Sequence, residues 1–170
     1  MKWIGALLFI STTTWAGFEW SKRLVNRPKH IRQLKNALQI LEAEILYSQA
    51  PLIDAFELIS KQIPKPTKYF FQMLTSDLNK NKTDFLEIWE KGVATYMKQS
   101  SLGPNETEIL YQFGRTLGQH DFTQQQKQIV LTLNHLDREL QEAKASEARY
   151  AKMAKSLGFL CGLFIVLLLM

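Results

Sequence analysis

The last third of the chain decides the fold: residues 123–170 read TQQQKQIVLTLNHLDRELQEAKASEARYAKMAKSLGFLCGLFIVLLLM. One row of residues in it recurs at alternating steps of four and three, which is the spacing of one face of an α-helix. The row consists of Ile129, Leu133, Leu136, Leu140, Ala143, Glu147, Tyr150, Ala154 and Leu157. No proline or glycine interrupts it before Gly158. The sequence therefore predicts one helix of about 45 residues, close to 70 Å long at about 1.5 Å per residue, that runs from a polar domain into an apolar end.

Both ends of the chain are apolar. Residues 3–18 form one stretch and residues 157–170 the other. Each is shorter than the span of about 20 residues that a membrane helix needs. Flanking tryptophans suit the headgroup level and flanking lysines can extend towards it; they are Trp3, Trp15, Trp20, Lys22, Lys152 and Lys155. We predict transmembrane helices over residues 1–20 and 156–170, with a domain over residues 21–155 between them.

Two alternatives remain open for these stretches. The first could be a cleaved signal peptide, for which Thr14-Trp15-Ala16 is a poor cleavage site because of its central tryptophan. The second could be a helix buried in a soluble core, but it is apolar on every face, which favours a membrane span.

Basic residues flank both apolar stretches on the side of the middle domain. They are Lys22, Arg23, Arg27, Lys29, Arg32 and Lys35 after the first, and Lys144, Arg149, Lys152 and Lys155 before the second. Such residues resist translocation, so the domain is expected in the cytoplasm, with both termini outside it. The net charge of +5 fits anionic lipid, at about 1 kcal/mol per basic residue. No aromatic residues interleave with the basic cluster, so we expect no nucleic-acid partner.

The middle domain reads as helices joined by short turns. Pro28, behind Asn26, suits a helix start, and Pro51 suits a second. Residues 63–66, 81–83 and 100–104 break the pattern, with Thr83 as the expected cap of a fourth helix. Asn105 with Glu108, and Thr123 with Gln126, resemble capping boxes for a fifth and a sixth helix.

Six helices with short connections predict an antiparallel bundle of all-α class. The first and sixth helices both lead into apolar ends, so we expect them to pair with each other. Their heptads could alternatively form a coiled coil between chains.

The sequence offers no catalytic, cofactor or metal site. His120-Asp121 lies in a predicted turn without a nearby serine or cysteine nucleophile. There is no His-Glu-x-x-His motif, no cysteine pair around the single Cys161 and no phosphate-binding glycine loop. Gly158 and Gly162 have the spacing of a transmembrane packing motif, which also arises by chance. Gly114 and Gly118 have the same spacing in the polar domain, where close packing or a helix cap explains it better.

Several segments together resemble the stage III sporulation protein AB family of endospore-forming bacteria. They are Thr13-Thr-Trp-Ala-Gly-Phe-Glu19 with Lys22-Arg23, Arg27-Pro28, Arg32-Gln-Leu34, Leu41-Glu-Ala-Glu-Ile45, Phe113-Gly, Thr116-Leu-Gly-Gln-His-Asp121, Gln126-Lys127 and Lys155-Ser-Leu-Gly-Phe159. The resemblance covers essentially the whole chain and is weakest from about residue 61 to 104.

The resemblance implies a component of a channel-like complex that joins mother cell to forespore, in the mother-cell membrane around the forespore. Family members are similar to the inner-membrane platform proteins of type II secretion and type IV pilus systems, whose cytoplasmic domains are six-helix bundles. The partners implied are a cytoplasmic secretion-type ATPase encoded alongside and other membrane proteins of the complex, with homo-oligomers also open.

Two functions follow as hypotheses. The first is a non-catalytic platform that docks the ATPase, either at the basic segment from Arg27 to Lys35 or at the polar turn of Gly118, Gln119, His120 and Asp121. The second is a membrane scaffold that organises anionic lipid or associates with itself.

Overall fold

The computed structural model describes the backbone of residues 2–48, 50–80, 84–117 and 122–169, and the side chains of residues 21–48, 50–80, 84–117, 124–150 and 153. Its elements in chain order are α1 Lys2–Ala43, the π-helical turn η1 Glu44–Ser48, α2 Leu52–Gln62, α3 Thr67–Lys80, α4 Phe85–Gln99, α5 Pro104–Thr116 and α6 Phe122–Leu169. The described part of the chain is thus wholly helical, and the predicted all-α class with six α-helices is confirmed.

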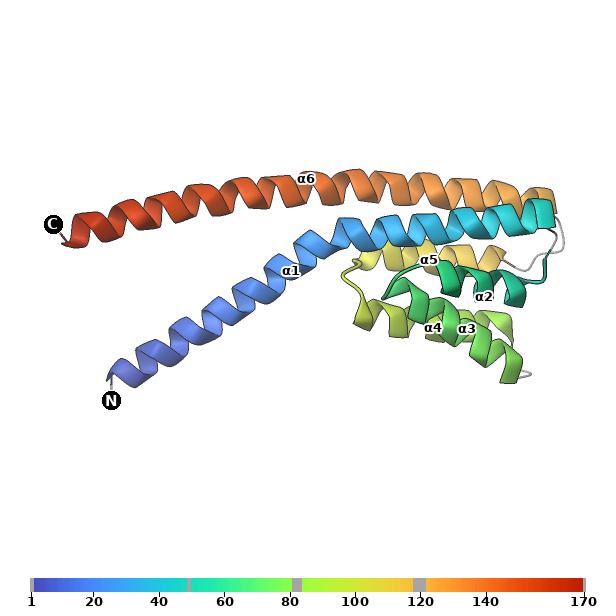
Figure 1. Ribbon diagram of the computed structural model, residues 1–170, viewed down its shortest axis with the longest axis horizontal. Helices are drawn as coiled ribbons and strands as arrows, with labels where there is room; N and C mark the ends of the chain where they lie inside the picture. The colour runs from blue at the N-terminus through green and yellow to red at the C-terminus, as the bar shows by residue number, and fades with distance from the viewer. Residues whose placement is uncertain (1, 49, 81–83, 118–121, 170) are drawn as a thin grey trace.

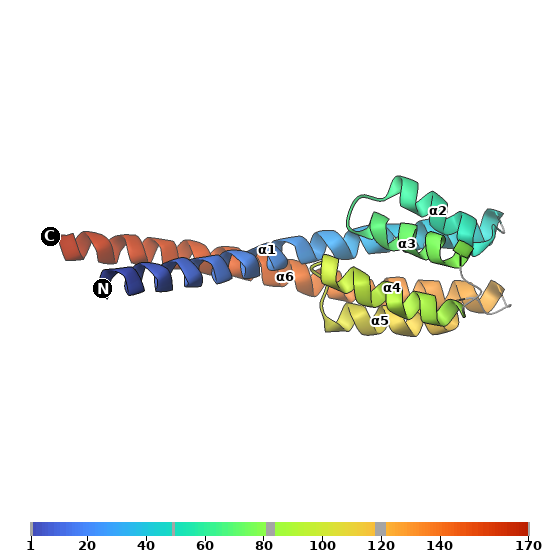
Figure 2. The same ribbon diagram turned by 90° about the horizontal axis from the view of Figure 1, so that it is seen from below.

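The two long helices, α1 and α6, lie side by side within the bundle and run in opposite directions, and beyond the bundle α1 bends away from α6 (Figure 1). The four short helices cover one side of this pair: α2 and α3 contact α1, α5 contacts α6, and α4 packs against α3 and α5 (Figures 1 and 2). Both long helices extend from the same end of the bundle, which we call the proximal end; the α2–α3 and α4–α5 connections lie there (Figure 1). The opposite, distal end holds η1 and the start of α6. The predicted pairing of the first and sixth helices is confirmed.

The longest element is α6, an uninterrupted helix of 48 residues. It begins in the bundle and continues past it to Leu169. The prediction of one helix that continues into the apolar end is therefore confirmed.

Pro28 lies inside α1, so the prediction that a helix begins there is wrong. Proline lacks the amide hydrogen that would bond the carbonyl four residues earlier, here that of Leu24, and its ring crowds that carbonyl. Helices bend at such positions, and α1 bends where it leaves the bundle (Figure 1). The helix continues on both sides of Pro28, so the chain makes one kinked helix.

The short helices begin and end close to the predicted positions, but their predicted N-terminal caps are misplaced. The break at Ile63–Pro66 separates α2 from α3 as predicted. The fifth helix begins at Pro104 rather than behind Asn105, and its first turn is closed by Glu106, whose Oε2 accepts the Gly103 amide hydrogen at 2.6 Å. The predicted capping box of Asn105 and Glu108 is therefore wrong. The N-cap of α4 is Asp84 rather than the predicted Thr83, and α6 begins at Phe122, so Thr123 lies inside the helix; both of these predicted caps are wrong.

An aromatic cluster fills the space between the helices. Trp89 of α4 is fully buried, and its indole Nε1 donates to the Leu110 carbonyl of α5 at 2.8 Å. Rings from α2, α3 and α5 surround it: Phe56, Phe70 and Phe113 have centroids 6.2, 5.3 and 5.6 Å from it. Apolar residues of α1 and α6 close the core at heptad positions, among them Ile31, Leu34, Leu38, Leu41, Ile129, Leu136 and Leu140.

Gly114 explains how close α5 comes to α4. A Cβ atom at Gly114 would lie 2.1 Å from Trp89 Cδ1, a distance that no real side chain accommodates without movement. The predicted close packing at Gly114 is confirmed, while Gly118 lies outside the described residues.

Within the described residues, no helix combines the length and the apolarity that a membrane crossing requires. The side chains of residues 1–20 and 154–170, where the two transmembrane predictions fall, lie outside that description.

Candidate functional site

The basic segment of α1, residues 22–35, separates into exposed and paired side chains. Lys22, Arg23, Lys29 and Arg32 are exposed. Arg27 and Lys35 are partly buried and form ion pairs with carboxylates of other helices. Arg149 of α6 is exposed, and the side chains of Lys152 and Lys155 lie outside the description. The exposed members remain available to lipid or to a partner, as the sequence predicts for all of them.

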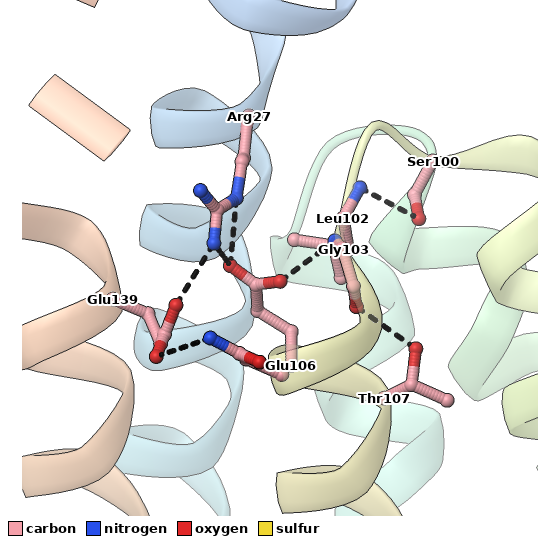
Figure 3. A network of polar contacts seen from close by, with 8 residues as sticks. Arg27, Ser100, Leu102, Gly103, Glu106, Thr107 and Glu139 are labelled. Carbon is pink, nitrogen blue, oxygen red and sulfur yellow. Dashed lines mark hydrogen bonds and ion pairs between the residues drawn. The ribbon is translucent and has the colours of Figure 1, made fainter. Parts of the chain in front are cut away.

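Arg27 joins three helices at the proximal end (Figure 3). Its guanidinium donates through Nε to Glu106 Oε1 of α5 at 2.9 Å and through Nη2 to Glu139 Oε2 of α6 at 2.8 Å. Glu139 Oε1 also accepts the amide of Asn105 at 3.1 Å. The side chain of Glu106 is fully buried, with Arg27 and the Gly103 amide as its partners. This network holds α1 against α5 and α6 at the point where both long helices leave the bundle.

The pair of Lys35 and Asp137 forms a second link between α1 and α6. The Lys35 ammonium, by a hydrogen bond and by its charge, holds the pKa of the Asp137 carboxyl below its ordinary value. Asp137 is exposed to solvent, so this pair contributes little to stability.

His30 also contacts the α4–α5 connection. Its Nδ1 accepts the Ser101 amide hydrogen at 2.9 Å, which requires the neutral imidazole. Burial, and to a lesser extent the nearby Lys29 charge, lowers the pKa of His30 below its ordinary value of 6.5. The imidazole is thus a positioning group for the proximal connection.

A buried polar group crosses the middle of the bundle. The hydroxyls of Thr67 and Tyr96 lie 2.8 Å apart, and the Thr67 hydroxyl donates to Gln33 Oε1 at 3.3 Å. Burial raises the pKa of Tyr96 well above its ordinary value. These contacts tie α3 and α4 to α1 without forming a reactive site.

The other predicted site residues fall outside what is described. Gly118, Gln119, His120 and Asp121 are outside the described residues. Gly158 and Gly162 lie in the last part of α6, beyond the described side chains. Their proposed roles stay predictions.

Two surface features were not predicted from the sequence. Tyr47, in η1 at the distal end, is 87% exposed, although a large aromatic side chain is usually at least half covered. A groove of about 520 Å³ opens between α3 and α4, lined by Lys65, Pro66, Tyr69, Phe70, Met73, Thr95, Tyr96 and Gln99. The groove was not predicted, because residues 61–104 contain few of the segments that resemble the family. The exposure of Tyr47 was not predicted either, because the heptad spacing indicates only which residues are buried.

No group of three metal-ligating side chains gathers in the described residues. The ionisable groups that come together, Arg27 with Glu106 and Glu139, and Lys35 with Asp137, are already paired. Their arrangement suits holding helices together.

Comparison with known proteins identifies the family. The model of the stage III sporulation protein AB family matches residues 2–170. A protein named stage III sporulation protein AB of Bacillus subtilis (strain 168) is 44% identical over 170 residues, covering 100% of this chain and 99% of that protein. A solved structure of stage III sporulation protein AB (SpoIIIAB) superposes with a TM-score of 0.69 at 40% identity, covering 73% of this chain and 98% of that one. The chain belongs to the stage III sporulation protein AB family.

Proposed function

We propose that this protein is a non-catalytic membrane platform of a sporulation-specific secretion or channel complex between mother cell and forespore, and that its bundle docks a cytoplasmic secretion-type ATPase. The family supports the role in sporulation. The anchoring in the mother-cell membrane around the forespore, with both termini outside the cytoplasm, is the part of the proposal that the charge distribution supports.

The observation that carries the proposal is the shared exit of the two long helices. Both α1 and α6 leave the bundle at the proximal end as continuous helices that lead into the apolar ends of the chain (Figures 1 and 2). Spans over residues 1–20 and 156–170 would then enter one membrane from the same end of the bundle. The bundle would be held at one membrane face by two stiff helices, which suits transmission of motion between a cytoplasmic motor and membrane partners.

The distal end is the surface that a cytoplasmic partner reaches. The α4–α5 connection at the proximal end contacts α1 at His30, about ten residues from the end of the predicted span, or about 15 Å along the helix. A folded partner does not fit into so narrow a gap. The exposed Tyr47 in η1, with Glu44 in the same turn and Asp54 in the first turn of α2, lies at the other end. Tyrosine is one of the residue types enriched among those that carry most of the binding energy at protein interfaces.

Co-purification from sporulating cells tests the docking. The full chain should bring down the ATPase encoded alongside it, and Tyr47→Ser combined with Asp54→Lys should reduce the recovered ATPase at least ~10-fold, as loss of an anchoring residue does. The matched control is Lys29→Ser combined with Arg32→Glu, which changes exposed residues at the proximal end. Equal recovery with wild type and with both variants would refute docking at the distal end, and no recovery by the folded wild-type chain would refute the platform function.

The second candidate function is a scaffold that organises anionic lipid. The exposed Lys22, Arg23, Lys29 and Arg32 favour it. Reversing Lys29 and Arg32 to glutamate separates the two functions. If the protein is a lipid scaffold, this variant should lose both its salt-sensitive lipid binding and its function in sporulation. A platform would keep ATPase recruitment and sporulation when lipid binding weakens.

A further inference from the structure

We infer that Lys65, Lys68 and Lys98 form a second anionic-lipid contact, which sets the bundle's orientation against the membrane face; this rests on the membrane anchoring proposed above. We call these three the proximal lysines. They belong to the α2–α3 connection, the first turn of α3 and the last turn of α4. The sequence separates them from the basic flanks of the apolar ends, and only the fold brings them to the proximal end.

The adjoining stretches of chain hold no acidic residue that would offset the charge of the proximal lysines. Lys65 and Lys98 are exposed and Lys68 is half-buried. None of the three takes part in the ion pairs of the described side chains, and Lys65 instead lies over the Tyr69 ring at 4.8 Å. No acidic residue occurs between Glu57 and Asp77, or between Glu90 and Glu106. This edge of the bundle is therefore basic over two separate stretches of chain.

Helix stability does not explain the whole set. Lys98 lies in the last turn of α4, where the helix dipole favours a cation. Lys68 lies in the first turn of α3, which contains no acidic residue, and there the dipole disfavours a cation. The amides of Lys68 and Tyr69 already donate to the carbonyls of Pro64 and Pro66. The unusual feature is thus the positive charge of Lys68 at a helix N-terminus, which an anionic partner outside the bundle would offset.

The distance to the membrane suits that partner. Contacts place the two connections level with α1 residues 27–33: Ser101 bonds to His30, and Thr67 bonds to Gln33. Counted from the predicted span end at residue 20, this is about 10–20 Å at ~1.5 Å per residue. Long lysine side chains extend towards the headgroups and shorten the gap. The remaining distance between the lysine ammonium groups and the headgroups is on the order of one Debye length, about 8 Å at physiological ionic strength. The lysines are therefore attracted to anionic headgroups, and this attraction weakens with added salt.

The consequence is a bundle with two different ends. Contact of the proximal lysines with headgroups turns this edge towards the membrane and leaves Tyr47 and Asp54 facing the cytoplasm. Anionic lipid would then set the orientation of the bundle against the membrane rather than its capacity to bind a partner.

Fluorescence quenching in nanodiscs tests the inference on the full chain. A fluorophore is attached at Gln62→Cys, an exposed position beside the α2–α3 connection, in a Cys161→Ser background. The nanodiscs contain headgroup-nitroxide phosphatidylcholine, with or without phosphatidylglycerol. We expect stronger quenching with phosphatidylglycerol and its loss at high salt. K65E/K68E/K98E should lower it to the level of phosphatidylcholine alone, since each lysine changes the membrane-facing population about fivefold.

The control is K80E/K91E/K127E, which makes the same charge change at exposed positions away from the proximal end and should keep the lipid response. Quenching that is independent of phosphatidylglycerol, or equal for both variants, would overturn the lipid contact. If K65E/K68E/K98E lost ATPase recovery while the lipid response persisted, the lysines would serve a protein partner and the inference would be wrong. Failure of the wild-type chain to co-elute with nanodiscs would instead reject the membrane anchoring itself.

Discussion

Replacing Arg27 with methionine should weaken the bundle at the point where its long helices leave it. Methionine keeps the apolar stem of the arginine but leaves the fully buried Glu106 carboxylate without its cation. Removing one partner of a buried ion pair costs about 3–5 kcal/mol. The Arg27 side chain is 24% exposed and also pairs with Glu139. Solvent screening therefore lowers the expected loss of stability to about 2–3 kcal/mol. For a bundle of this size the melting temperature should fall by roughly 6–12 °C.

A second substitution tests the sign of the effect. Glu106→Gln keeps an oxygen that can accept the Gly103 amide hydrogen, but removes the charge. In the wild type it breaks the pair with Arg27 and should destabilise the bundle. In the Arg27→Met background it removes an uncompensated buried charge and should restore stability, because a neutral group is less costly to bury than an unpaired ion.

Thermal unfolding of the full chain in detergent micelles, followed by far-ultraviolet circular dichroism, measures both effects. Arg32→Met is the matched control, since Arg32 is exposed on the same helix and such a change usually stays within ~0.5 kcal/mol. Two results would contradict the role of the network in holding the helices together. One is a melting temperature of Arg27→Met equal to that of Arg32→Met. The other is an equal fall in melting temperature on adding Glu106→Gln to the wild type and to Arg27→Met.

Two further predictions concern packing and protonation. Gly114→Ala should destabilise by about 3 kcal/mol in denaturant unfolding, because its methyl group would overlap the rigid Trp89 ring at 2.1 Å; Gly92→Ala, which meets a flexible side-chain end at 2.9 Å, should cost clearly less, and the opposite order would contradict this account. Because the His30 pKa is lowered on folding, the histidine stabilises the bundle fully above pH 6.5 and loses that contribution as the pH falls through the folded pKa. Unfolding midpoints measured across this range should show a smaller acid loss in His30→Asn, whose side-chain oxygen can still accept from Ser101; an unchanged pH profile would exclude His30 as the source.

The local sequence pattern was sufficient to predict the helices and their order along the chain. The heptad row from Ile129 predicted α6 as one helix through the end of the bundle, because residues at that spacing share a face whatever they pack against. The break at residues 63–66 was equally local, since proline restricts the residue before it. Pro28 shows the limit of such signals: the same residue suits a helix start and a kink. The choice depended on the residues around it, which continue the helix.

The partners of the charges were decided only by the tertiary structure. Arg27 meets Glu106 and Glu139, which are 79 and 112 residues away in the chain, and nothing in its own neighbourhood distinguishes it from the exposed Lys29. A basic cluster read along the chain therefore looks uniform, while folding turns some members inwards to ion pairs and leaves others facing solvent. The same holds for Lys65 and Lys98, which lie at the proximal end only because α2 and α4 both run towards it (Figure 1). Helical periodicity is a property of adjacent residues and can be read from them, whereas charge pairing depends on which helices pack together, and that is set by the whole core at once.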